Sequence, residues 1–335
     1  MAYDKFWENN EKVNKTEKAK LEKDGLRILD DIPEYAKNGF ASIPKDQWDL
    51  FKWAGLYLQR PKEDGYFMMR VNVPSGILSK DQVEALAGIA RDYGRGVFDI
   101  TTRQAVQFHW LEIGEIPDIF NRLEAVGLSS VGACGDITRN IVGNPIAGID
   151  PNELFDTSGI VKEVFDFFQN NEDFSNLPRK YKMSISTNLH NASNAEINCI
   201  SFTPAVKVLD GVEKQGFHLK IGGGLSARPF LAQTLDAFIE PERTLEVAVA
   251  VTTIFRDYGY REKRHLARLK FLMADWGTEK FLAKIQEYTG PLPTRGEEPV
   301  GEWNAGYFYG MHDQKQEGLK FLGFNVPVGR LDADE

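Results

Sequence analysis

The sequence has few cysteines and no long hydrophobic run. Only two of its 335 residues are cysteine, Cys134 and Cys199, too few for a disulfide framework or for a metal site built from four thiolates. No stretch approaches the roughly 20 apolar residues that a membrane-spanning helix needs, and the first residues lack the apolar segment of a signal peptide. We therefore expect a cytoplasmic protein with two free thiols.

An excess of positive charge is also missing. The chain has 49 acidic and 40 basic residues and a formal net charge of -9 at pH 7, whereas domains that bind nucleic acid through its phosphates are usually basic. We expect neither a nucleic-acid partner nor a membrane partner. An anion site would need a local group of Arg and Lys side chains, so basic residues within strands or Gly-rich loops are the informative ones.

Several common catalytic signatures are absent. The five histidines show no HExxH or other ligand spacing, so we expect no metal ligands in this chain, and no Gly-x-Ser-x-Gly elbow occurs. The run Gly222-Gly223-Gly224-Leu225 is not a GxGxxG fingerprint. We expect it to allow close approach of the backbone to a flat cofactor.

The pattern of apolar and turn residues predicts an α+β protein. Residues 1–50 are polar and are interpreted as an amino-terminal arm, with a helix around 14–29 and a loop at 38–44; a solvated, partly ordered extension is the alternative. Residues 51–127 are predicted to form half of a ferredoxin-like layer. Runs of β-forming residues predict its strands, and apolar residues at helical spacing predict its helices. The predicted elements are strands at 66–74, 97–101 and 106–110, and helices at 80–93, capped by Ser79, and 117–126.

Residues 128–290 are predicted to form a mixed α/β domain. Its first part, 129–148, is rich in Gly and Asn, which favours a loop pressed against a ligand. The predicted elements that follow are helices at 160–170, 244–258 and 266–276 and strands at 181–187, 197–204 and 216–221.

The end of the chain repeats an earlier segment. Residues 325–335 match residues 72–82 at six of eleven positions, and both copies run through Asn-Val-Pro to a turn. The copy at 72–82 follows a predicted strand and precedes a helix, so we expect a strand at 318–326 and then a capped helix. Because a lone strand cannot bury an apolar face, we expect residues 291–335 to begin a second, truncated ferredoxin-like half. Chance similarity of a short motif is the alternative.

Several basic residues lie in strands or in Gly- and Asn-rich loops and not on charged helix faces. Side chains two apart on a strand point the same way, so Lys180 and Lys182 would direct both ammonium groups to one place. Such donors in a low-dielectric pocket hold an oxyanion and stabilise the charge it gains on reduction. Ordinary salt bridges are the alternative for each residue taken singly. The basic positions are Arg70, Arg103, Arg139, Arg179, Lys180 and Lys182.

From about Trp53 to Glu335 the sequence resembles the siroheme and iron–sulfur sulfite and nitrite reductase family. The resemblance rests on motifs in family order: GLYLQR, GYFMMRVNVPSG, DITTRQAVQFHW, GACGDITRNIVGNPIAGID, LPRKYKMSIS, GFHLKIGGGLSARP and IFRDYGYREKRHLARLKFL. It implies a pseudo-symmetric enzyme in which two ferredoxin-like halves form one domain. Two related α/β domains would enclose siroheme, bridged by a cysteine to a [4Fe-4S] cluster.

The resemblance also implies roles for individual residues. Arg70, Arg139, Lys180 and Lys182 would surround the substrate on the open face of the siroheme iron. Residues expected to contact the macrocycle and its carboxylates are Thr101, Arg103, Gln107, His109, Asn140, Arg179 and Arg228. Tyr57 and Cys134 resemble a Tyr and Cys pair that lies beside the siroheme in some sulfite-reducing relatives.

The implied reaction is the six-electron reduction of sulfite to sulfide, or of nitrite to ammonia, fed by reduced ferredoxin. Lys182 favours sulfite, because members dedicated to nitrite tend to have Asn there. The family's four cluster-binding cysteines are missing from this chain, so we expect it to be inactive as it stands. A non-catalytic siroheme- or anion-binding module and an unrelated α+β protein are the alternatives from other classes.

Overall fold

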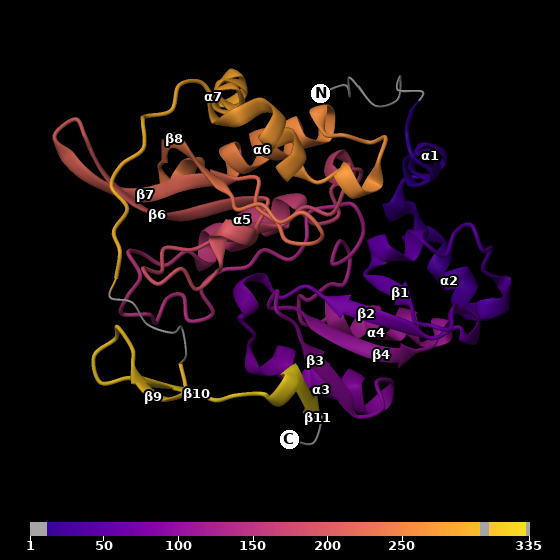
Figure 1. Cartoon of the computed structure of the whole chain (residues 1–335). Helices are drawn as coiled ribbons and strands as arrows, with labels where there is room; N and C mark the ends of the chain where they lie inside the picture. The colour runs from indigo at the N-terminus through magenta and orange to yellow at the C-terminus, as the bar shows by residue number, and fades with distance from the viewer. Residues whose placement is uncertain (1–11, 302–307, 333–335) are drawn as a thin grey trace.

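The computed structural model describes residues 12–301 and 308–332, and it shows two units that lie side by side (Figure 1). Its helices are α1 (Lys15–Glu22), α2 (Ile28–Asn38), α3 (Lys80–Asp92), α4 (Ile116–Glu124), α5 (Ser158–Phe168), α6 (Thr244–Tyr258) and α7 (Leu269–Thr289). Its strands are β1 (Leu56–Leu58), β2 (Phe67–Val71), β3 (Val97–Ile100), β4 (Val106–Leu111), β5 (Met183–Ile185), β6 (Ile200–Leu209), β7 (Val212–Ile221), β8 (Gln233–Ile239), β9 (Gly310–Asp313), β10 (Lys320–Gly323) and β11 (Arg330–Asp332). The mixture of sheets and helices confirms the predicted α+β class.

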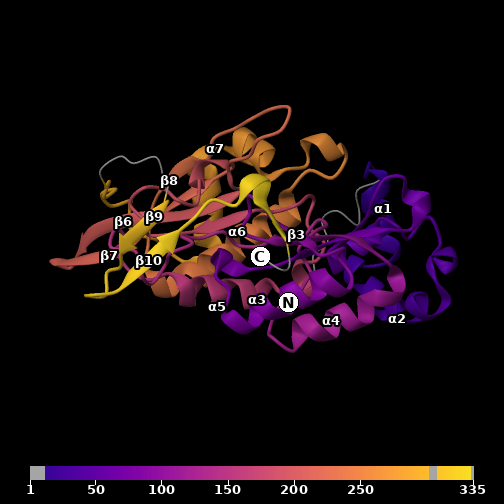
Figure 2. The same ribbon diagram turned by 90° about the horizontal axis from the view of Figure 1, so that it is seen from below.

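The first unit is an antiparallel sheet with strand order β1-β2-β4-β3-β11, and α2, α3 and α4 pack together beside it (Figure 2). Side chains along β2 alternate between buried and half-buried, as expected for a sheet with one face on a core. Phe67, Met69 and Val71 are buried in a core that includes Ile89 of α3 and Ile119 of α4. Arg70 alternates with these residues and lies on the other face of the sheet, so its guanidinium faces the space between the two units.

The second unit contains the sheet β5-β6-β7-β8, in which β5 is parallel to β6 and the other pairs are antiparallel. One hydrophobic core joins this sheet to α5, α6 and α7. Helices α6 and α7 are in contact with each other, and α7 also contacts β8. The sheet is therefore covered by helices.

Predictions that depend on local patterns agree with the structure. Helix α3 begins directly after Ser79, whose hydroxyl accepts a hydrogen bond from the Gln82 N–H, while the Gln82 side chain accepts one from the Ser79 N–H. Helix α6 has the predicted bounds of 244–258. Strands β3 and β4 begin at the predicted residue and differ by one residue at their ends, and helices α4 and α5 differ from the predicted ranges by one or two residues at each end.

Other predictions were wrong in extent. Strands β1, β8, β9 and β11 were not predicted. Helix α7 was predicted to end at 276 but continues to Thr289, with a left-handed Gly277 (φ 71°) at the break. The predicted helix at 14–29 is two helices separated by residues 23–27, since Lys23 adopts an extended conformation after α1.

The amino-terminal arm is anchored by buried charges, at least from residue 12 on. Glu17 and Lys20 of α1 are 0% and 4% exposed. The Glu17 carboxylate accepts a 2.6 Å hydrogen bond from Arg261 and pairs with Lys20 at 2.6 Å. Lys20 also lies 3.5 Å from the Asp136 carboxylate. These contacts favour the wrapping arm over a solvated extension, while residues 1–11 lie outside the described residues.

The repeat of residues 72–82 at 325–335 has the same backbone conformation in both copies. Ser75 has φ 56° and ψ 4°, and Val328 has φ 51° and ψ 11°; each is followed by a left-handed glycine, Gly76 (φ 72°) and Gly329 (φ 74°). Strand β10 is shorter than the predicted 318–326 and pairs with β9, and β11 then adds to the edge of the first sheet beside β3. The expected second helix would fall on residues 333–335, outside the described residues.

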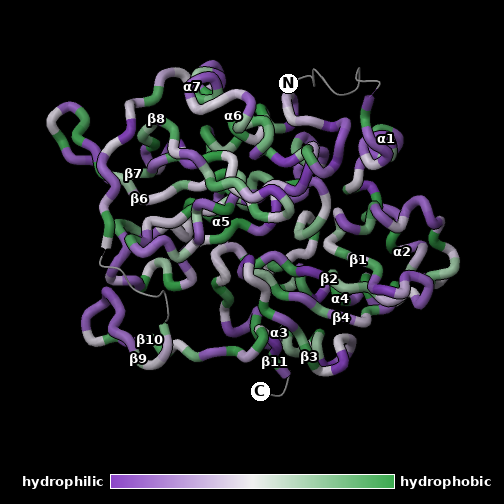
Figure 3. The backbone as a smooth tube through the Cα atoms, viewed as in Figure 1, coloured by the Kyte–Doolittle hydropathy of each residue, from purple (hydrophilic) through white to green (hydrophobic). Residues whose placement is uncertain are grey.

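Hydrophobic and hydrophilic residues alternate along the helices and strands of both units (Figure 3). Within the described residues, no helix is both long enough and apolar enough to span a bilayer.

Candidate functional site

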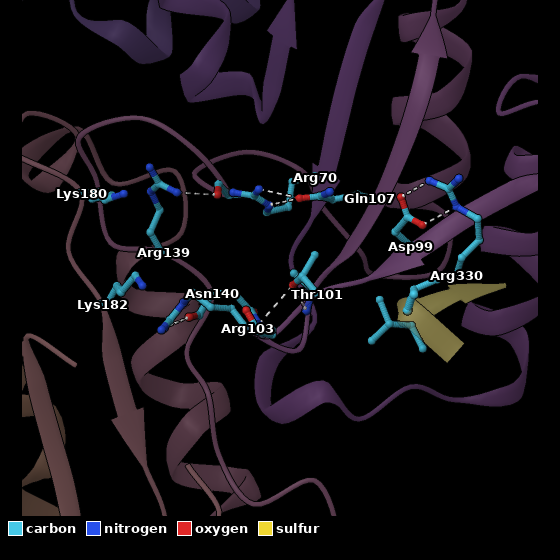
Figure 4. A pocket seen from close by; sticks show the side chains of 15 residues that line it. Arg70, Asp99, Thr101, Arg103, Gln107, Arg139, Asn140, Lys180, Lys182 and Arg330 are labelled. Carbon is cyan, nitrogen blue, oxygen red and sulfur yellow. Dashed lines mark hydrogen bonds and ion pairs between the residues drawn. The ribbon is translucent and has the colours of Figure 1, made fainter. Parts of the chain in front are cut away.

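A cavity of about 660 Å³ lies where the two units meet (Figure 4), within the usual range for small-molecule and cofactor sites of roughly 300–1,000 Å³. The first sheet, the loop before residue 140, the segment before β5 and the last described strand all contribute to its wall. Its lining residues are Arg70, Asp99, Ile100, Thr101, Thr102, Arg103, Ala105, Gln107, Ala133, Arg139, Asn140, Lys180, Lys182, Val328 and Arg330.

Arg70 is oriented by its neighbour across the sheet. Arg70 on β2 and Gln107 on β4 are paired residues in the antiparallel ladder. The Arg70 Nε donates a 3.0 Å hydrogen bond to the Gln107 side-chain oxygen, and its Nη1 lies 3.5 Å from the Sγ of Cys134. A neutral amide fixes the direction of the guanidinium without neutralising it, so the charge remains available to the cavity.

Arg139 is held by the loop that carries it. Its guanidinium donates to the backbone carbonyls of Gly135 (3.1 and 2.8 Å) and Ala133 (3.2 Å), and the residue is only 8% exposed. Tyr57 lies beside this group, and burial together with the nearby Cys134 raises the pKa of its phenol. Arg139 therefore brings a buried positive charge to the cavity with no carboxylate among its hydrogen-bond partners in the described residues.

Lys180 and Lys182 reach the same cavity from one extended segment. Tyr181 between them is fully buried and its ring stacks on Phe255 at 5.6 Å, so the two lysines point away from the core together. Burial, together with the repulsion of Arg139 on Lys180 and of Arg103 on Lys182, lowers the pKa of each ammonium to about 8. Within the described part of the chain neither ammonium forms an ion pair or hydrogen bond. Each is therefore poised to bind an anion and to release a proton near neutral pH.

Arg103 lies between the two units and is fixed by neutral acceptors. It donates to the Asn198 side chain (2.8 Å), to the Asn140 carbonyl (2.8 Å) and to the Met183 carbonyl (3.2 Å). Burial lowers its pKa to about 10, and its Nε has no hydrogen-bond partner among the described residues. The side-chain oxygen of Asn140 is also buried without a partner, while Thr101 accepts hydrogen bonds from the backbone N–H groups of Arg103 and Ala105.

The far wall of the cavity contains Asp99 of β3, the one carboxylate among the described residues that line it. Arg330 of β11 binds it through two hydrogen bonds of 2.8 and 3.0 Å (Figure 4), and His109 lies 3.2 Å away. Burial lowers the pKa of His109, and Arg330 lowers the pKa of Asp99. The pairing leaves the cavity with an excess of positive charge.

Eight of the residues expected from the sequence line one cavity, but five do not: His109, Arg179, Arg228, Tyr57 and Cys134. Arg179 turns to the opposite side of its segment and lies 3.4 Å from Asp136. His109 contacts Asp99, and Arg228 is exposed in the loop before β8. Their expected cofactor contacts stay predictions, as do the roles expected for Tyr57 and Cys134.

The glycine run after β7 has a different environment from the one expected. A Cβ on Gly223 would lie 2.2 Å from the Glu196 carbonyl oxygen, and one on Gly224 would lie 2.5 Å from Arg268. The close approach is therefore to the protein itself. Sequence reasoning also missed Asp99, Arg330 and the buried Arg268 and Lys270; the alternation of Arg268 and Lys270 around an apolar residue in HLARLKFL was the available signal.

Among the described residues, no group of three His, Cys, Asp or Glu side chains is placed to hold a metal ion.

Two family models match the sequence. Residues 134–291 match the nitrite and sulphite reductase 4Fe-4S domain, and residues 59–126 match the nitrite/sulfite reductase ferredoxin-like half domain. The chain is 41% identical over 334 residues to a ferredoxin–nitrite reductase of Synechococcus elongatus, an alignment that includes 97% of this chain and 64% of the relative. It is 40% identical to sulfite reductase [ferredoxin] 2 of Mycolicibacterium paratuberculosis, covering 96% of this chain and 60% of the relative.

A solved structure is also similar. The Mycobacterium tuberculosis NirA protein superimposes with a TM-score of 0.89 at 36% sequence identity, covering 97% of this chain and 62% of that one. The chain thus spans about 60–64% of the length of these relatives.

Proposed function

The chain belongs to the nitrite and sulfite reductase family, and from that premise we propose that its cavity is the oxyanion site of a siroheme-dependent reductase. The proposed reaction is the six-electron reduction of sulfite to sulfide, with reduced ferredoxin as the electron donor. One observation carries the proposal: six cationic side chains from both units line a single cavity, in a chain whose net charge is -9. Bringing this many positive charges together costs free energy unless an anion occupies the cavity.

The residues present fit a carboxylate-rich cofactor. The buried Nε of Arg103 is a donor without a partner, and Thr101, Gln107 and Asn140 add polar groups along the same wall. Guanidinium groups bind carboxylates through paired hydrogen bonds, which suits a flat ring bearing several acidic substituents. In this proposal Arg103, Gln107 and Asn140 would hold siroheme, which would supply the redox-active iron for the reduction. A [4Fe-4S] cluster would need ligands beyond the two cysteines of this chain.

The four residues Arg70, Arg139, Lys180 and Lys182 are proposed to act on the substrate. Arg70 and Arg139 are held by neutral partners, so their fixed charges would orient the oxyanion and stabilise negative charge that develops on its oxygens. The lysines would donate protons as oxygen leaves as water, because a pKa of about 8 lies close to neutral pH. Electrostatic orientation and proton supply thus come from different residue types.

Sulfite is favoured by the pair of ammonium groups at Lys180 and Lys182, which suits an anion of two charges better than one of a single charge. Nitrite is the second candidate. It is supported by the relatives from Synechococcus elongatus and Leptolyngbya laminosa, both ferredoxin–nitrite reductases at 41% and 40% identity.

A single substitution in the complete enzyme tests the choice of anion. Lys182→Asn removes one ammonium from the cavity and keeps a polar side chain, so sulfite turnover with reduced ferredoxin should fall relative to nitrite turnover. Lys80→Asn is the matched control, because the Lys80 side chain is 86% exposed on α3, away from the cavity. An unchanged ratio of the two rates in Lys182→Asn would remove the basis of the sulfite assignment.

A further inference from the structure

A second layer of positive charge lies behind the cavity. Arg268 is 9% exposed and Lys270 is 2% exposed. Arg268 acts electrostatically on Arg103 and Lys182 of the cavity wall, and also on Lys270. In the described part of the chain none of these four side chains forms an ion pair with a carboxylate. The Nε atoms of Arg103 and Arg268 are both buried without hydrogen-bond partners. Buried cations normally have an anionic partner, because an uncompensated charge in the interior is strongly destabilising.

Cys199 occupies the centre of this layer. It directly precedes β6, its side chain is fully buried, and its Sγ lies 3.3 Å from the Nη2 of Arg268. The backbone of Cys199 is fixed by a 2.9 Å hydrogen bond from its N–H to the Lys182 carbonyl. The charged and titratable groups that act on it are Arg103, Lys180, Tyr181, Lys182, Arg268 and Lys270. Five of these six groups are cationic and none is a carboxylate.

We propose that Cys199 is a thiolate in the folded protein and that it is the counter-charge that positions Arg268 behind the anion cavity and Arg103 in the cavity wall. The thiolate accepts the hydrogen bond from the Arg268 guanidinium, which gives the buried arginine a charged partner. Arg268 in turn fills the space left by Gly224, where a Cβ would lie 2.5 Å from its Nη2. Cys199 is therefore a positioning residue and does not line the cavity.

The electrostatic surroundings support this charge state. Desolvation opposes the thiolate, but Arg268 and Lys182 outweigh it and lower the pKa of Cys199 below its usual value. A group whose pKa falls on folding stabilises the protein at a pH above its unfolded value, and that stabilisation is lost as the pH falls through the folded value. The thiolate should thus persist to a lower pH than the thiolate of an ordinary cysteine, and disappear on further acidification.

The two cysteines of the chain provide a direct experiment. The chain with Cys134→Ser retains only Cys199, and the chain with Cys199→Ser retains only Cys134. The ultraviolet absorption band of a thiolate, which a protonated thiol lacks, is followed from pH 9 downward in the folded Cys134→Ser chain. We expect the midpoint for loss of the band to lie below about 8.5, the ordinary pKa of a thiol. A midpoint at or above that pH would overturn the proposal.

The melting temperature of substituted chains is the second measurement. Cys199→Ser removes the charge, so its melting temperature should lie below that of the unsubstituted chain at pH 8, and the difference should shrink as the pH falls. Cys199→Asp restores a negative charge and should recover part of the loss at pH 8. A Cys199→Ser deficit that is the same at every pH, or an Asp variant less stable than the Ser variant at pH 8, would contradict the proposal. Neither measurement depends on reductase activity, so the proposed function and this inference can fail separately.

Discussion

Removal of the Asp136 charge should destabilise the protein strongly, because this carboxylate compensates cations from three segments. Asp136 is fully buried and accepts hydrogen bonds of 2.7 and 3.0 Å from Arg264. Arg179 lies 3.4 Å and Lys20 lies 3.5 Å from it. Despite the cost of burial, these cations lower the pKa of Asp136 to about 2. The substitution Asp136→Asn keeps the shape and leaves the cations without their partner.

The magnitude follows from the pKa. A fall from the ordinary value near 4 to about 2 corresponds to roughly 2.5 kcal/mol of folding free energy, and breaking a buried pair from one side costs about 3–5 kcal/mol. We expect Asp136→Asn to lose about 2–4 kcal/mol at pH 7. Because the pKa is depressed on folding, the stabilisation is complete above pH 4 and is lost as the pH falls toward 2, so wild type and variant should converge there.

Scanning calorimetry between pH 2 and pH 7 measures both the loss and its pH dependence. Asp166→Asn is the matched control: its carboxylate pairs with Lys162 on the exposed face of α5, where an ion pair is worth at most about 1 kcal/mol. Equal melting temperatures for Asp136→Asn and Asp166→Asn at pH 7 would refute the reasoning, and so would a deficit in Asp136→Asn that persists unchanged at pH 2.

Two further predictions concern the cavity and the first unit. Nitrite binding, measured by calorimetry, should weaken as the pH rises above about 8, because Lys180 and Lys182 lose their charge there. The affinity should fall by about tenfold per pH unit for each lysine whose proton is required. A constant affinity from pH 7 to 9.5 would exclude these lysines as ligands. Ser79→Ala removes the cap of α3 and should lower the unfolding free energy by about 1 kcal/mol in urea titrations, whereas Lys80→Ala at the next position should change it by less than about 0.5 kcal/mol.

Features encoded by neighbouring residues could be predicted from the sequence. Ser79 and Gln82 mark the start of α3 because the side chain of each accepts a hydrogen bond from the backbone N–H of the other. The two-residue period of an extended segment places Lys180 and Lys182 on one side. The same period places Arg179 on the other side with Tyr181, so the expectation that Arg179 joins the two lysines conflicted with the rule that grouped them.

Features that depend on distant contacts could not be predicted. Glu17 and Lys20 are charged residues in a polar helix, and their burial follows from Arg261 and Asp136, more than a hundred residues away. Strand β8 follows a loop that contains three glycines, and its position is set by pairing with β7. The partner of Arg330 is Asp99, 231 residues earlier, and no local pattern links them.

The position of the cavity between two units has a consequence for folding. Its walls come from β2 and β4, from the segment before β5 and from β11, so none of them alone reproduces the arrangement of charges. An anion that needs all of these side chains recognises only molecules in which both cores have formed and docked. Ligand binding thus selects the finished protein from its folding intermediates, and bound anion or cofactor should slow the separation of the two units in hydrogen-exchange measurements.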